Sequence, residues 1–180
     1  VGGVHPSNNT RMVLETIPNI DAVIAYEADE ALVNFIDFVS GQASKKSLTQ
    51  IAMFQKGEYL NIERKIIPRD KQVNYSPDYG TLPIGKYGSY GEIGVYRWLR
   101  KNPPVATILS NRGCRGSCTF CSVRSFNGKG VRRRNRFLVV DEIQRQAEEY
   151  GVKHFMWLDD DLFQPDSVDL FNEITRRNLN

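Results

Sequence analysis

The chain has 180 residues, of which 41% are hydrophobic and 25% charged, and its net charge is +3. This composition is typical of a folded globular protein with one domain or parts of two. No apolar run approaches the roughly 20 residues that a membrane-spanning helix needs, and no basic-then-apolar leader argues for export. We therefore expect a cytoplasmic protein without a membrane span. Because the chain begins at Val1 rather than Met, we also expect a fragment of a longer protein.

Residues 1–41 alternate between strand and helix patterns. The apolar start runs into a glycine-rich loop, and the following patterns predict a helix at 10–17, a strand at 21–25 and a helix at 32–39. Strand, helix, strand and helix within so short a segment predict a parallel sheet whose faces are covered by helices.

Residues 42–103 differ in pattern and predict a connector that contains a β-hairpin. Two short apolar segments at 51–55 and 59–62 are separated by Lys-Gly-Glu, which predicts two strands joined by a glycine-bearing turn. The segment 67–104 is rich in Tyr, Gly and Pro and has no clear periodicity. It is too aromatic for a disordered linker, so we expect an ordered connection.

The α/β pattern resumes near residue 105. A buried-type strand at 105–110 precedes the cysteine-bearing loop, and a helix at 139–150 and a strand at 154–158 follow it. We expect a last helix to begin at Asp166 or Ser167. Two consecutive βα units are the start of a doubly wound sheet or of a βα barrel.

All three cysteines fall within eight residues, as Cys114, Cys118 and Cys121 in the spacing Cys-x3-Cys-x2-Cys. A secreted scaffold would spread an even number of cysteines for pairing, so this odd cluster predicts a reducing compartment and a bound metal. Residues 111–136 carry eight basic side chains and no acidic one, whereas the rest of the chain is net acidic. The coincidence of the basic segment with the cysteines indicates a functional site.

Three thiolates on one short loop can hold three irons of a cubane iron–sulfur cluster, since thiolate is the usual protein ligand of such iron. The fourth iron would have no protein ligand and could bind a cofactor or a substrate. Basic surroundings favour thiolates and help to offset the negative charge of a cluster. A zinc site usually has four ligands in paired spacing, and the nearest further candidate, His154, belongs to the following strand. A zinc site and three unrelated buried thiols remain as alternatives.

The three-cysteine loop, with Phe120 just before its last cysteine, resembles the signature motif of the radical S-adenosylmethionine (SAM) enzymes. The resemblance implies a [4Fe–4S] cluster on Cys114, Cys118 and Cys121, whose open iron binds the amino and carboxylate groups of SAM. It also implies that reductive cleavage of SAM yields a 5′-deoxyadenosyl radical, with Phe120 packed near the adenine. The resemblance covers residues 104–180 as the opening of a partial TIM-type (βα) barrel.

A run of three aspartates follows the second strand of this region. In βα barrels the chemistry lies on loops at the carboxyl ends of the strands, so we expect the cysteine loop and Asp159, Asp160 and Asp161 on the same rim. A carboxylate there could accept hydrogen bonds from the ammonium group or the ribose hydroxyls of SAM. The radical SAM family often has Gly-Gly-Glu at this place, and this chain has Asp-Asp-Asp instead. The alternative is a solvated acidic turn before Pro165.

The N-terminal residues resemble the end of a cobalamin-binding domain, which precedes the barrel in one radical SAM subfamily. The resemblance rests on Gly2 and Gly3 after an apolar residue and on the later acidic residues Glu27, Asp29 and Glu30. It implies that the backbone of the glycine pair approaches the nucleotide tail of cobalamin, which the lack of side chains permits.

The expected fold class is therefore α/β, with three parts. Residues 1–41 are expected to be the C-terminal part of a Rossmann-like cobalamin-binding domain, 42–103 the connector with its hairpin, and 104–180 the N-terminal part of the radical SAM barrel.

The resemblance implies an enzyme that uses a [4Fe–4S] cluster, SAM and cobalamin to methylate, cyclise or rearrange a small-molecule substrate. It implies an electron donor such as flavodoxin or ferredoxin, and nucleic acid is not the expected partner. One alternative is an RNA-modifying radical enzyme similar to the methylthiotransferases, which the basic run 129–136 favours. Those enzymes resemble a different N-terminal domain with its own cysteines, and residues 1–103 contain none. The other alternative is a non-enzymatic module that holds zinc or a structural iron–sulfur cluster.

Overall fold

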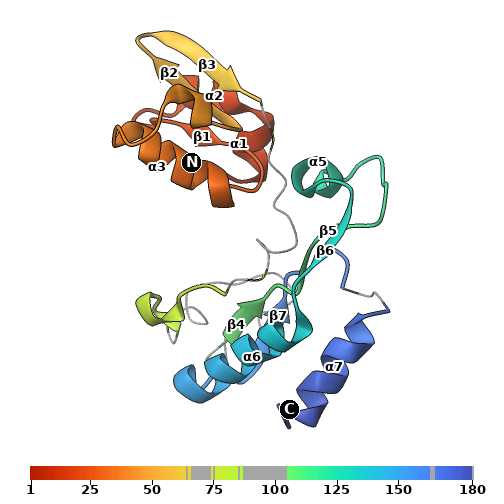
Figure 1. Cartoon of the computed structure of the whole chain (residues 1–180). Helices are drawn as coiled ribbons and strands as arrows, with labels where there is room; N and C mark the ends of the chain where they lie inside the picture. Colours follow the sequence, from red (N-terminus) through yellow and green to blue (C-terminus); the bar gives the residue numbers. More distant parts are fainter. Residues whose placement is uncertain are drawn as a thin grey trace. The chain divides into compact units, whose positions relative to one another are not determined.

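A computed structural model of the chain describes residues 1–63, 65, 74, 76–84, 86, 105–162 and 165–179. Contacts divide the chain into two compact units: unit 1 contains residues 1–69 and 116–129, and unit 2 contains residues 70–115 and 130–180. Figure 1 labels the helices and strands of both units. Within the described ranges, no helix has the length and apolar character needed to cross a membrane.

Unit 1 begins with helices α1 (Val4–Asn8) and α2 (Thr10–Thr16), followed by strand β1 (Val23–Ile24) and helix α3 (Asp29–Val39). The two helices and the strand predicted from residue 10 onward are present. Helix α2 ends just before the Ile-Pro pair, because the residue that precedes a proline disfavours helical backbone. Helix α1 directly follows the glycine pair and was not predicted.

The sheet of unit 1 corrects the expectation of a parallel sheet in residues 1–41. Strand β1 pairs antiparallel with β2 (Ile51–Gln55), and β2 pairs antiparallel with β3 (Glu58–Ile62), in the order β1-β2-β3. Within the described residues, the segment before α1 pairs with β1 only through one isolated parallel bridge, between Gly2 and Ile24. Because the hairpin presents a five-residue strand edge, β1 finds its main hydrogen-bonding partner there.

Lys56 and Gly57 form the turn of the β2–β3 hairpin, with φ angles of +51° and +85°. Positive φ at both positions is typical of two-residue turns whose twist matches that of antiparallel strands. The predicted hairpin is confirmed, with the difference that Glu58 belongs to β3 rather than to the turn.

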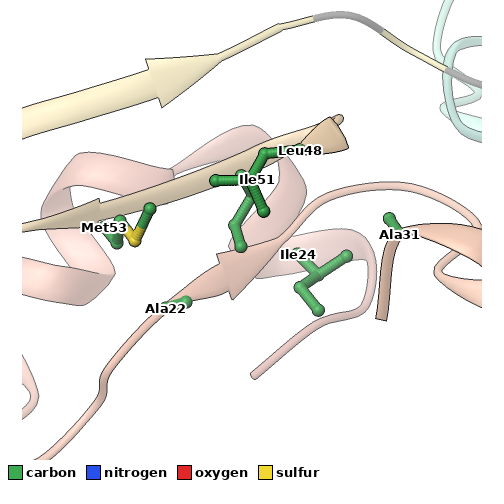
Figure 2. Close-up of a cluster of buried hydrophobic side chains, with 6 residues drawn as sticks. All are labelled: Ala22, Ile24, Ala31, Leu48, Ile51 and Met53. Atoms are coloured by element: carbon green, nitrogen blue, oxygen red, sulfur yellow. The ribbon is translucent and has the colours of Figure 1, made fainter. Parts of the chain in front are cut away.

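Unit 1 has a hydrophobic cluster on each face of its sheet, because successive residues of a strand point to opposite faces. Figure 2 shows the first cluster, which consists of Ala22, Ile24, Ala31, Leu48, Ile51 and Met53. Ala52, between two members of this cluster, packs instead with Val13 and Leu14 of α2. Helix α3 therefore covers one face of the sheet and α2 covers the other.

Unit 2 contains the two βα units that the sequence predicts. Strands β4 (Val105–Ile108) and β7 (His154–Trp157) pair in parallel. Helix α6 (Arg136–Tyr150) connects them, and helix α7 (Ser167–Arg176) follows β7.

Helix α6 has a defined cap at each end. The side-chain oxygen of Asn135 accepts a hydrogen bond from the backbone N–H of Phe137 at 2.9 Å, so the helix begins earlier than the predicted position 139. Gly151 ends the helix with a left-handed backbone (φ +65°).

The core of unit 2 lies between one face of the β4–β7 sheet and the two helices. It consists of Ile108, Val139, Val140, Ile143 and Leu170. Thr107, next to Ile108 in β4, is exposed on the opposite face. The cysteines and aspartates of the predicted site lie in the segments that follow the carboxyl ends of β4 and β7.

A hairpin that was not predicted frames the cysteine loop. Strand β5 (Asn111–Cys114) pairs antiparallel with β6 (Gly130–Arg133), and the short helix α5 (Val123–Asn127) lies between them in the chain. The strand predicted at 105–110 therefore ends at Ile108, and the chain turns before β5 begins.

The connector predicted at 42–103 is described in part. It contains the short 3-10 helices η1 (Lys45–Ser47) and η3 (Tyr79–Thr81), with the β2–β3 hairpin between them. Most of the segment rich in Tyr, Gly and Pro, which we expect to be an ordered connection, falls outside the described residues.

Candidate functional site

None of the three cysteines forms a disulfide. Cys114 ends β5 and is half-buried, whereas Cys118 and Cys121 are exposed. The backbone N–H of Cys121 donates to the carbonyl oxygen of Cys118 at 3.2 Å, so one turn brings these two residues together. Cys114 belongs to unit 2, and Cys118 and Cys121 belong to unit 1.

The donor set fits an iron–sulfur cluster by its chemistry. It offers three thiols outside any disulfide, in a segment rich in basic side chains whose charge would help to offset that of a negative cluster. Among the described residues, no group of three Cys, His, Asp or Glu side chains is assembled around a common point that could hold a metal ion. His154, the further zinc candidate, lies in β7 with an intermediate degree of burial.

Asp159 contacts the backbone just before β5. Its Oδ1 accepts hydrogen bonds from the backbone N–H groups of Ser110 (2.6 Å) and Asn111 (2.9 Å). Its Oδ2 accepts a hydrogen bond from the Ser110 hydroxyl at 2.5 Å. The segments that follow β4 and β7 therefore lie side by side, as expected for neighbouring parallel strands.

Asp161 contacts the other end of β5. Its Oδ2 lies 3.8 Å from Cys114 Sγ, 3.3 Å from the backbone nitrogen of Arg115 and 3.1 Å from Arg115 Nε. The Asp161 side chain is 12% exposed, and the Arg115 side chain is 60% exposed. Asp160 lies between these two aspartates and is exposed. The structure thus brings Asp159 and Asp161 to the segment that leads into the cysteine loop.

A buried ion pair, which the sequence analysis missed, supports the same segment. The Arg134 guanidinium lies 2.6 Å from the Glu142 carboxylate, with side-chain exposures of 6% and 3%. Glu142 also accepts hydrogen bonds from the Tyr79 hydroxyl (2.6 Å) and the Ser76 hydroxyl (2.8 Å). Burial, followed by the hydrogen bond to Glu142, raises the pKa of Tyr79 well above its ordinary value.

The sequence holds a signal for this pair. Glu142 falls between Val140 and Ile143 on the apolar face of helix α6, and an acidic residue in such a place requires a buried partner.

The basic run 129–136 is partly neutralised within unit 2. Three of its arginines form ion pairs with carboxylates of α6, of α7 or of the residue before α7: Arg133 with Asp166, Arg134 with Glu142, and Arg136 with Asp169.

Gly2 and Gly3 differ in their surroundings. A Cβ on Gly2 would lie 3.1 Å from the Ile24 carbonyl oxygen, so the bridge to β1 already accounts for this glycine. Gly3 has a φ of +106°, and nothing lies within 4 Å of the place of its missing Cβ. The backbone at Gly3 is therefore open to close approach by another molecule.

Each unit has a cavity, and the cavity in unit 2 is lined by predicted site residues. In unit 1, a cavity of about 340 Å³ is lined by polar groups that include Ser7, Thr10, Gln50, Asn61 and Lys65. In unit 2, a cavity of about 430 Å³ lies along β7 and the run Asp159, Asp160 and Asp161. Phe120, in the turn between Cys118 and Cys121, is 91% exposed.

Solved radical SAM proteins share this mixed α/β fold with small sheets. The radical S-adenosylmethionine methyltransferase TsrM from Kitasatospora setae aligns with a TM-score of 0.70 and 19% identity, over 98% of this chain and 33% of that chain. The cobalamin-dependent S-adenosylmethionine radical enzyme OxsB aligns with a TM-score of 0.65 and 18% identity, over 94% of this chain and 22% of that chain.

The chain is also similar in sequence to several curated proteins, among them the following two. An uncharacterized methyltransferase of Pyrococcus horikoshii is 26% identical over 160 residues, which are 89% of this chain and 32% of the relative. The anaerobic magnesium-protoporphyrin IX monomethyl ester cyclase of Cereibacter sphaeroides is 29% identical over 164 residues, which are 89% of this chain and 25% of the relative. The chain thus spans a quarter to a third of the length of these two relatives.

A protein-family model matches the part of the chain that contains the cysteine motif. Residues 108–179 match the Radical SAM superfamily. This match includes all three cysteines of the Cys-x3-Cys-x2-Cys motif, which follows β4, and the three aspartates that follow β7. The segment 108–179 of this chain therefore belongs to the radical SAM superfamily.

Proposed function

We propose that this chain is part of a cobalamin-dependent radical SAM enzyme that acts on a small-molecule substrate. The observation that carries the proposal is the three-cysteine motif, which begins at the end of β5 within a segment that matches the Radical SAM superfamily. In this proposal, residues 1–41 are the end of a Rossmann-like cobalamin-binding domain, 42–103 are a connector, and 104–180 begin a partial βα barrel.

Cys114, Cys118 and Cys121 would hold a [4Fe–4S] cluster. Two observations support this: none of the three cysteines forms a disulfide, and the basic segment around them would help to offset the negative charge of a cluster. When bound, the cluster supplies an electron for the reductive cleavage of SAM. The protein's own task is to place and shield the reacting groups.

The aspartate run after β7 and Phe120 would bind SAM. A carboxylate among Asp159, Asp160 and Asp161 would accept hydrogen bonds from the ammonium group or the ribose hydroxyls, beside the cavity along β7. Phe120 is exposed in the turn between Cys118 and Cys121, where its ring could pack near the adenine.

Gly2 and Gly3 would contact the nucleotide tail of cobalamin. The open space and positive φ at Gly3 support a close approach of the backbone to a ligand. The polar lining of the unit 1 cavity suits a cofactor that carries many amide groups. When bound, cobalamin supplies a methyl group for transfer.

The names of the relatives define the reaction classes of the proposal. One curated relative is named as a methyltransferase and another as a cyclase, and OxsB is described as cobalamin-dependent. These names support methyl transfer or cyclisation of a small molecule, and we add rearrangement as the third reaction class that the sequence resemblance implies. The proposed enzyme lies in the cytoplasm and receives electrons from a donor such as flavodoxin or ferredoxin.

An RNA-modifying radical enzyme is the second candidate, because the basic run 129–136 could contact phosphates. Three arginines of this run are paired with carboxylates, which lowers the positive charge that they offer. We therefore favour the small-molecule enzyme. Tight, salt-sensitive binding of RNA by the full-length protein would reverse this preference.

The test is anaerobic reconstitution of the full-length protein, with analysis of iron and sulfide and electron paramagnetic resonance (EPR) spectra with and without SAM. We expect a cubane signal that changes when SAM is added, and loss of iron when the three cysteines are replaced by alanine. Ser117→Ala, in the same loop, is the matched control and should retain the cluster. Zinc without iron, or a cluster signal indifferent to SAM, would overturn the proposal.

A further inference from the structure

The β5–β6 hairpin, which carries Cys114 and is called the cysteine hairpin below, begins at the corner between β4 and β5. Strand β4 ends at Ile108 and β5 begins at Asn111, so Leu109 and Ser110 make the whole connection. Cys114 lies at the far end of β5, three residues after Asn111. Because a strand advances about 3.3 Å per residue with little freedom, the position of Cys114 follows from how this corner is held.

Asp159 holds the corner from the side of β7. Its two carboxylate oxygens accept three hydrogen bonds, from both backbone N–H groups at 110 and 111 and from the Ser110 hydroxyl. A carboxylate has about four lone-pair sites, so little acceptor capacity is left for a cofactor. Hydrogen bonds to an ionised acceptor are also about twice as strong as neutral ones.

Arg134 holds the same corner from the side of α6. Its backbone N–H donates to the Ser110 carbonyl oxygen at 2.9 Å, and its guanidinium NH1 donates to the Leu109 carbonyl oxygen at 2.8 Å. The ion pair with Glu142 fixes the guanidinium in this orientation. The corner is therefore bound through its N–H groups on one side and through its carbonyl oxygens on the other.

We propose that Asp159 and Arg134 are positioning residues that hold the 109–111 corner, and through β5 Cys114, in place for cluster binding. The proposal rests on the proposed function, because it takes Cys114 as a cluster ligand. The proposal also gives Asp159 a role different from that of Asp160 and Asp161: Asp159 positions the cysteine hairpin and does not bind SAM.

The first arm of the test needs no cluster. Hydrogen–deuterium exchange is measured on the metal-free full-length protein for peptides that cover residues 109–114. Asp159→Asn replaces one acceptor oxygen by an amide donor at nearly constant volume. We therefore expect severalfold faster hydrogen–deuterium exchange of the backbone amides at residues 110 and 111. Asp160→Asn makes the same change of charge one residue away, at an exposed position, and should leave these peptides unchanged.

The second arm reads the cluster without SAM. We expect Asp159→Asn to release iron to a chelator severalfold faster than wild type and to alter the EPR spectrum of the reduced cluster before SAM is added. Asp160→Asn should leave this SAM-free spectrum unchanged. Ser110→Ala, a milder change, should act in the same direction, and its effect should not add to that of Asp159→Asn because both remove the same contact.

The outcomes separate the two proposals. Unchanged hydrogen–deuterium exchange at residues 110 and 111 in Asp159→Asn would overturn the positioning role. An EPR spectrum of Asp159→Asn that equals that of wild type without SAM, and differs from it only after SAM is added, would overturn it as well. If the wild-type protein binds no iron under reconstitution, the proposed function fails, and the exchange arm alone decides whether Asp159 holds the corner.

Discussion

The Glu142 carboxylate lies 2.6 Å from the Arg134 guanidinium, and both side chains are almost fully excluded from solvent. Glu142 lies on the apolar face of helix α6, and Arg134 is the residue directly after β6. The pair joins the helix that packs on the β4–β7 sheet to the backbone from which the cysteine hairpin starts. A charge taken out of water in this way depends on its partner for its stability.

Removal of Glu142 should therefore destabilise the protein strongly. We expect Glu142→Gln to lower the free energy of unfolding by about 3–5 kcal/mol, because it leaves the buried Arg134 guanidinium without a counter-charge. The measurement is urea unfolding of the metal-free full-length protein. Glu148→Gln, an exposed position on the same helix, is the control and should change the free energy by less than about 0.5 kcal/mol. Equal effects of the two substitutions would show that the ion pair is not buried in solution.

Glu173 should give the stability of unit 2 a dependence on acidic pH. Hydrogen bonds from Arg176 and Arg177 hold the pKa of Glu173 at about 2, below the ordinary value of 4.5. Its ionised form is favoured in the folded state, so the stabilisation is present above pH 4.5 and is lost as the pH falls toward 2. Thermal unfolding of wild type and Glu173→Gln should therefore differ at neutral pH and converge between these two values. A difference that stays constant through this range would contradict the interpretation.

The hydrophobic core of unit 2 should be sensitive to cavities. Ile108 is 1% exposed and packs against Val140 and Leu170, so Ile108→Ala should cost about 2–5 kcal/mol of unfolding free energy. Leu138→Ala removes a similar volume at a position that is 40% exposed and should cost much less. Chemical denaturation of both variants gives the comparison. A small loss for Ile108→Ala would mean that the Ile108 side chain is not packed between the sheet and the helices as described.

Helix α5 should depend on an aromatic contact within unit 1. The rings of Tyr26 and Phe126 lie 6.2 Å apart at an interplanar angle of 66°, and Lys65 Nζ lies 4.2 Å from the Tyr26 ring centre. An edge-to-face aromatic pair contributes about 0.5–1.5 kcal/mol beyond the area it buries. We expect Phe126→Ala to increase protease cleavage within residues 116–129. Phe120→Ala, in the same loop but 91% exposed, should leave cleavage unchanged; the reverse order would refute the contact.

Patterns within short segments predicted most of the elements. The β2–β3 hairpin, β4, α6 and β7 each have an apolar periodicity or a turn residue that acts over a few neighbouring positions, and the structure contains all four. The cysteine spacing and the basic segment likewise lie within one stretch of chain, so the candidate site could be located from the sequence alone. The expectation that Asp159, Asp160 and Asp161 lie on the same rim as the cysteine loop came from the topology of consecutive βα units, and the structure shows contacts of Asp159 and Asp161 with the segment 110–115.

Only the tertiary structure decided which groups are partners. Strands β5 and β6 have no apolar alternation: β5 does bury alternate residues, but these are Asn111 and Gly113, which carry no apolar side chain. Ser110 and Asp159 are 49 residues apart, and a hydrogen bond between them has no local pattern in the sequence. The partnership of Arg134 with Glu142 and the antiparallel pairing of β1 with β2 are of the same kind. Residue spacing encodes which face of an element is buried, whereas the choice of partner depends on which elements the packed core brings together.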